Sequence, residues 1–97
     1  MKKGYWVVAY RAVGDEAMMS RYLALAGPAL GQFGARLLVS PASTVTPREA
    51  GLNQMMVVVE FETYDIALAA YESDDYKKAL AVLGPEVERD LRIAEGA

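Results

Sequence analysis

Residues 55–62, MMVVVEFE, form the most strand-like stretch of the chain, and residues 5–13, YWVVAYRAV, have the same character. Both stretches are rich in the β-branched and aromatic residues that favour strands. Successive side chains of a strand point to opposite faces of its sheet, and in residues 5–13 both alternating sets are largely apolar. We therefore predict two central strands that are buried on both sides.

The sequence between these two stretches predicts a helix, a short strand and a long connection. Asp15 can cap a helix that runs to about Phe33, and because proline removes one helical hydrogen bond, we expect a kink or a break at Gly27-Pro28. Gly34 is placed to end this helix, and residues 35–39 predict a strand. Residues 41–54 contain two prolines and predict a long loop or a loose hairpin.

The rest of the chain predicts two short helices and a last strand. Thr63 can cap a helix over residues 64–72, and Ser73 can cap another that ends at Gly84-Pro85. Residues 89–94 alternate apolar and charged side chains, which predicts a weaker strand.

The element order β-α-β-β-α-β predicts an α+β fold, a ferredoxin-like sandwich formed by a single domain over residues 1–97. In this arrangement a four-stranded antiparallel sheet carries its helices on one face, with the first and third strands central. The opposite face of the sheet, here called the open face, has no cover. Since the central strands are apolar on both sides, we expect a second copy of the chain to cover the open face in a homodimer.

Composition excludes several classes of chemistry. The chain has 97 residues, no histidine, no cysteine and a net charge of -3. It therefore lacks the residues for a Ser-His-Asp triad, a thiolate nucleophile, a disulfide or the usual zinc site, and we expect no metal and no cofactor. The negative charge disfavours nucleic acid as a partner. No apolar run approaches the roughly 20 residues of a membrane helix, so we expect no membrane partner and a cytoplasmic location.

Alternation along the strands assigns a mixture of apolar and charged side chains to the open face. Among them are five candidate ligand-binding residues: Tyr5, Arg11, Arg36, Glu60 and Arg92. Charged groups among apolar neighbours are typical of a small polar pocket. The open-face set also contains Val7, Ala9, Leu38, Ser40, Met56 and Val58.

Arg36 and Glu60 are expected to form a pair. If the second and third strands pair about a midpoint near residue 48, the two residues lie opposite each other. The pair could anchor a carboxylate or enolate ligand, with Glu60 as a candidate catalytic base if burial raises its pKa. Alternatively, it is an ion pair that only fixes the register of the sheet or the geometry of a dimer.

The chain resembles the small, mainly bacterial proteins catalogued as domain of unknown function 1330, within the dimeric α+β barrel superfamily. The resemblance is carried by residues 4–8 (GYWVV), 22–24 (YLA), 33–39 (FGARLLV), 58–61 (VVEF) and 70–76 (AYESDDY), in this order and spacing. It implies a ferredoxin-like monomer and a homodimer whose sheets face each other. It implies no specific activity.

Three hypotheses for the function follow. The first is a homodimeric barrel protein that binds a small anionic or carbonyl-bearing molecule between sheet and helices, with its status as an enzyme undecided. The second is a cofactor-free oxygenase or isomerase with Glu60 as general base and Arg36 or Tyr5 stabilising an enolate. The third and weakest is an RNA-binding module. Residues 56–60 offer no aromatic side chains for stacking bases, and the chain is acidic.

Overall fold

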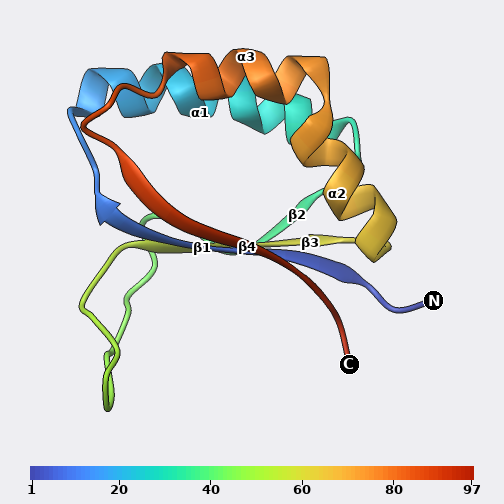
Figure 1. Cartoon of the computed structure of the whole chain (residues 1–97), viewed down its shortest axis with the longest axis horizontal. Coiled ribbons are helices and arrows are strands. Elements are labelled where there is room, and N and C mark those ends of the chain that lie inside the picture. The colour runs from blue at the N-terminus through green and yellow to red at the C-terminus, as the bar shows by residue number, and fades with distance from the viewer.

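The computed structural model describes all residues, 1–97, as an α+β fold with the predicted element order (Figure 1). The elements are β1 (Gly4–Ala12), α1 (Glu16–Gly31), β2 (Arg36–Val39), β3 (Met56–Phe61), α2 (Tyr64–Glu72), α3 (Asp74–Val82) and β4 (Glu88–Glu95). The strands form one antiparallel sheet in the order β2-β3-β1-β4. All three helices lie on one face of this sheet, which confirms the predicted topology and the central positions of β1 and β3.

Local sequence signals set the beginnings of the helices. Each predicted capping residue, Asp15, Thr63 and Ser73, accepts a hydrogen bond from the backbone N–H three residues further along the chain. These bonds satisfy donors that the first turn of a helix leaves without a partner. The positions of α1, α2 and α3 are therefore encoded locally.

The end of α1 differs in one respect from the expectation. The helix continues through Pro28 as one element to Gly31, so the expected break is absent. Pro28 lies in the last turn of α1. The hydrogen bond that proline cannot donate is therefore lost near the end of the helix, where few helical bonds follow. Gly34 then adopts a positive φ of 71°, and the N–H of Ala35 bonds the carbonyl of Leu30, as in a Schellman motif.

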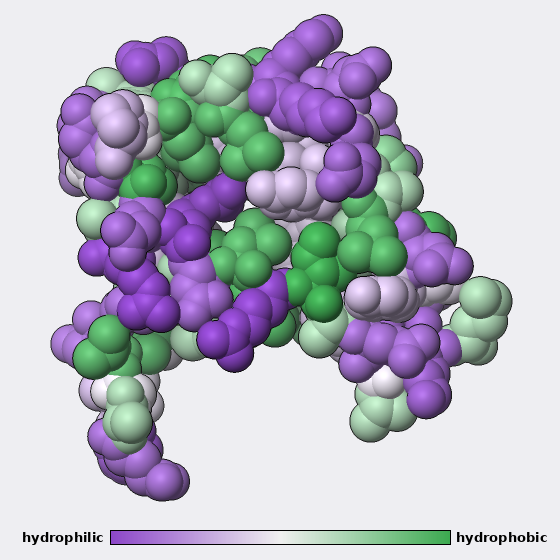
Figure 2. Space-filling model, in the orientation of Figure 1, coloured by the Kyte–Doolittle hydropathy of each residue, from purple (hydrophilic) through white to green (hydrophobic).

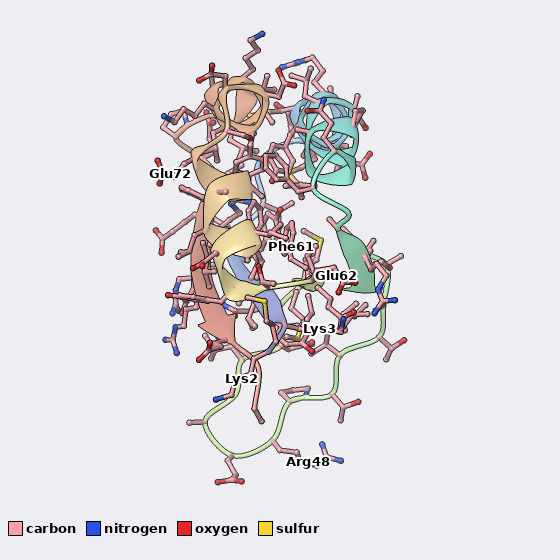
Figure 3. All side chains as sticks on the ribbon, turned by 90° about the vertical axis from the view of Figure 1, so that its right-hand side faces the viewer. Lys2, Lys3, Arg48, Phe61, Glu62 and Glu72 are labelled. Carbon is pink, nitrogen blue, oxygen red and sulfur yellow. The ribbon has the colours of Figure 1, made fainter.

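The core lies between the helices and the sheet. Its largest fully buried side chains are those of Trp6, Phe61 and Tyr76, and Trp6 Nε1 donates a hydrogen bond to the carbonyl of Ala67, 2.9 Å away. In Figure 3, Phe61 lies within this layer. The residues that alternate with the open-face set on β1, β3 and β4 are buried or pack against the core: Trp6, Val8, Tyr10, Val57, Val59, Phe61, Leu91 and Ile93.

The edge strand β2 departs from simple alternation. Leu37 pairs with Val59, but a bulge follows and Val39 pairs with Val58. Val39 therefore takes an open-face position that alternation assigned to Leu38 and Ser40. A bulge inserts one extra residue and resets the alternation, which a pattern of period two cannot reveal.

The connection between β2 and β3 contains no helix or strand, as predicted. In Figures 1 and 3 it extends past the sheet on the side away from the helices, with Arg48 far from the sheet. No helix in the structure is long and apolar enough to cross a membrane.

Candidate functional site

The first group of candidate residues meets on the open face as predicted. Arg36 and Glu60 are paired in the register of β2 and β3, and the Arg36 guanidinium donates to Glu60 Oε1. From β1, the Tyr5 hydroxyl donates to Glu60 Oε2 at 3.0 Å. Three strands thus contribute to one hydrogen-bonded carboxylate.

These bonds determine the acidity of Glu60. The hydrogen bond from Arg36 lowers the pKa of the Glu60 carboxyl below its usual 4.5, and the bond from Tyr5 acts in the same direction. Burial acts in the opposite direction but is outweighed. The condition under which Glu60 was a candidate base, a pKa raised by burial, is therefore not met in this chain. A carboxylate with a lowered pKa is a weak proton acceptor.

The other two candidate arginines form a separate network. Arg11 and Arg92 both donate to the carboxylate of Asp90, at 3.0 Å and 3.2 Å. No hydrogen bond or ion pair connects this network to the one around Glu60. The sequence prediction of one pocket with a single carboxylate therefore missed Asp90, although Asp90 alternates with Leu91 in the same way as Arg92 does.

A cavity of about 210 Å³ lies on the other side of the sheet, between the strands and α1. Figure 2 shows the opposite side of the molecule, that of α3 and β4, where hydrophobic and hydrophilic residues are mixed between the helices and the strands. None of the five candidate residues lines this cavity. The lining residues are Trp6, Val8, Tyr10, Tyr22, Leu23, Ala26, Gly27, Leu30, Gly31, Ala35, Leu37, Pro41, Val57, Val59 and Arg89.

Arg89 is the one charged residue of the cavity wall. It lies on β4 opposite Tyr10 of β1, and its guanidinium lies 5.8 Å from the ring centre of Tyr10 and 5.3 Å from that of Tyr22. Its hydrogen bonds go to the hydroxyl oxygens of Tyr22, at 3.1 Å, and Tyr76, at 3.2 Å. None of the ion pairs in the structure includes Arg89, so this half-buried cation has no carboxylate partner.

Arg89 and Tyr22 each keep a single charge state at neutral pH. Burial lowers the pKa of the Arg89 guanidinium, but the surrounding tyrosine oxygens outweigh burial and raise it above its usual range. Burial also raises the pKa of the Tyr22 hydroxyl, and the neighbouring Tyr76 adds to this effect. Arg89 is therefore a permanent cation, and Tyr22 is a neutral hydrogen-bonding group.

A count of donors shows what this cluster lacks. The hydroxyls of Tyr22 and Tyr76 lie 2.7 Å apart, so one donates to the other and the second hydroxyl hydrogen remains available. Two guanidinium nitrogens of Arg89 donate to these two oxygens, and its remaining N–H groups have no acceptor in the protein. The cluster therefore has spare donors and no spare acceptor of its own, while every buried polar side-chain atom in the structure has a hydrogen-bond partner.

Arg89 is not among the open-face candidates, but the sequence contains a signal for it. Arg89 precedes Leu91 and Ile93 by two and four positions, so alternation places it on the helix-covered face with them. A charged residue in an otherwise apolar, inward-facing set is an exception that indicates a partner or a ligand.

The sequence comparison agrees with this architecture. The model of a family described as a domain of unknown function, DUF1330, matches residues 3–97. The chain belongs to the DUF1330 family. No curated protein matches it. The DUF1330 resemblance noted in the sequence is thus confirmed over nearly the whole chain.

Solved structures share this fold at low sequence identity. A protein of unknown function from Rhodopseudomonas palustris aligns with a TM-score of 0.68 at 11% identity, covering 99% of this chain and 83% of its own. A dimeric ferredoxin-like protein of unknown function from Thermobifida fusca aligns with a TM-score of 0.63 at 13% identity, covering 97% and 91%. An ethyl tert-butyl ether d family protein from Bacillus halodurans aligns with a TM-score of 0.56 at 11% identity, covering both chains completely. At such identities the likeness shows the fold alone.

Proposed function

We propose that this protein binds a small anionic or carbonyl-bearing molecule in the cavity between α1 and the sheet, and that it does so as a homodimer. The observation that carries the proposal is Arg89, a half-buried cation without a carboxylate partner in the wall of an apolar cavity. Removing a charge from water is costly unless it is paired. A ligand with an anionic or carbonyl oxygen supplies the missing partner.

The donor count supports the same class of ligand. Carboxylate and carbonyl oxygens only accept hydrogen bonds, whereas the cluster of Arg89, Tyr22 and Tyr76 has donors to spare. An amine would bring further donors and a second positive charge beside Arg89. The proposed site therefore excludes cationic ligands.

The homodimer in this proposal uses the open face. Figure 1 shows no helix on this side of the sheet, and on the central strand β1 the side chain of Val7 is 37% exposed. Tyr5, Arg36 and Glu60 lie on the same face and satisfy one another, so they can enter an interface without leaving an unpaired charge. In this proposal the candidate residues of the open face serve the assembly, and Arg89 serves the ligand.

The ligand part is tested by thermal denaturation in the presence of small carboxylates, ketones, lactones and amines. Binding to the folded state raises the melting temperature. We expect stabilisation of the parent by carboxylates or carbonyl compounds and none by amines. In Arg89→Met this stabilisation should disappear, and in Arg89→Lys, which keeps the charge, part of it should remain.

The matched control for these variants is Arg48→Met. Arg48 lies in the connection between β2 and β3 and donates only to the carbonyl of its neighbour Pro47. This control should respond to ligands as the parent does. Equal stabilisation of the parent and of Arg89→Met by the same compound would show that the anchor lies elsewhere.

A further inference from the structure

The two ends of the cavity differ in chemistry. Its lining residues come from all four strands and from α1, so it crosses the sheet from the β2 edge to Arg89 on β4. Leu37 on the edge strand β2 and Leu23 on α1 line the cavity although they are 57% and 46% exposed. A ligand that fills this space meets one cationic end and one apolar end.

Two glycines of α1 leave room in the apolar part. Gly27 and Gly31 are four residues apart on the same side of the helix and both line the cavity. A Cβ atom added at either position would meet no atom within 4 Å. Both glycines are exposed and lie on the open side of the cavity, although glycine inside a helix is unfavourable relative to alanine.

We propose that the ligand is a monocarboxylate whose apolar part has the size of one aromatic ring, with its carboxylate at Arg89 and its ring below Gly27 and Gly31. This inference rests on the proposed function and narrows its ligand class. The aromatic side chains of Trp6, Tyr10 and Tyr22 in the wall suit a flat ring.

Volume and charge set the limits of this class. An apolar cavity of about 150 Å³ binds benzene. The cavity of about 210 Å³ therefore accommodates one ring and one small polar group. A single cation lines it, so a second carboxylate on the ligand would have no cationic partner in the cavity wall.

Calorimetric titration of the full chain with four compounds tests the proposal. Benzoate is the probe, benzamide replaces its charge with a neutral group, acetate removes its ring, and terephthalate adds a second carboxylate. We expect benzoate to bind at least tenfold more tightly than each of the other three. Binding of benzamide or terephthalate as tight as that of benzoate would overturn the ligand class.

Substitutions in α1 test the place of the ring. Gly27→Leu adds a side chain to the cavity wall and should weaken benzoate binding at least tenfold, and Gly31→Leu provides a second variant should the first fail to fold. Ala24→Leu, on an exposed position of the same helix outside the cavity, should bind as the parent does. Unchanged affinity in folded Gly27→Leu and Gly31→Leu would overturn the placement.

The outcomes separate this inference from the proposed function. If acetate binds as tightly as benzoate and both depend on Arg89, the anion site stands and the ring-sized class is wrong. If no carboxylate or carbonyl compound depends on Arg89, the proposed function itself fails.

Discussion

At the scale of single residues, Glu60 illustrates how neighbours determine the chemistry of a carboxylate. It lies on a central strand, it is only 8% exposed, and it accepts hydrogen bonds from Arg36 and Tyr5. Its lowered pKa means that the folded state holds the Glu60 proton less tightly than the unfolded state does. The pair therefore stabilises the fold above the usual pKa of the carboxyl, and this contribution is lost as the pH falls.

Arg36→Met should reveal this contribution through its pH dependence. At neutral pH the variant should melt at a lower temperature than the parent, because the carboxylate of Glu60 loses its charged partner. Between about pH 5 and pH 2 the difference should shrink as Glu60 becomes protonated in both proteins. Melting curves by circular dichroism measure this difference, with Arg48→Met as the control. A difference that stays constant over this range would show that the ion pair does not contribute.

At the scale of elements, replacing glycine with alanine is expected to have opposite effects on the stability of the fold at Gly4 and at Gly27. A Cβ atom at Gly4 on β1 would lie 2.5 Å from the carbonyl oxygen of Thr63 and 2.7 Å from Cα of Tyr64, at the start of α2. Gly4→Ala should therefore force backbone atoms apart and destabilise the fold by about 1–3 kcal/mol. Gly27→Ala meets open space inside a helix and should stabilise the fold by up to about 1 kcal/mol.

Urea denaturation of both variants measures the two free energies of unfolding. Stabilisation by Gly4→Ala would contradict the close approach of β1 and α2. Destabilisation by Gly27→Ala would contradict the open space below α1.

The elements also show what the sequence could predict. Strands, caps and the Arg36–Glu60 register follow from local patterns and from the midpoint of one hairpin, and the structure confirms them. A bulge after Leu37 shifts the alternation of side chains along β2, and the sequence contains no signal for this bulge. The cavity depends on how far α1 stands from the sheet, which is a property of tertiary packing. The candidate residues chosen from the sequence therefore lie on the opposite side of the sheet from Arg89, although the alternation of β4 indicates the position of Arg89.

At the scale of the whole molecule, a monomer would leave the open face of the sheet without a cover. Val7 is exposed at the middle of this face, where the proposed dimer would bury it. Val7→Asp should place a charge in that interface and convert the protein to a folded monomer, measured by size-exclusion chromatography with light scattering. Val13→Asp, at an exposed position beyond the end of β1, should remain dimeric. A parent that is itself monomeric at micromolar concentration would contradict the proposed assembly.

The central claim is that Arg89 anchors a carboxylate in the cavity between α1 and the sheet. The most direct test is a crystal structure of the protein with a bromobenzoate, in which the anomalous signal of bromine locates the ring. We predict a carboxylate within hydrogen-bond distance of the Arg89 guanidinium and a bromine signal in the cavity below α1. A carboxylate bound instead at Arg36, or at Arg11 and Arg92 on the open face, with the cavity empty, would contradict the claim.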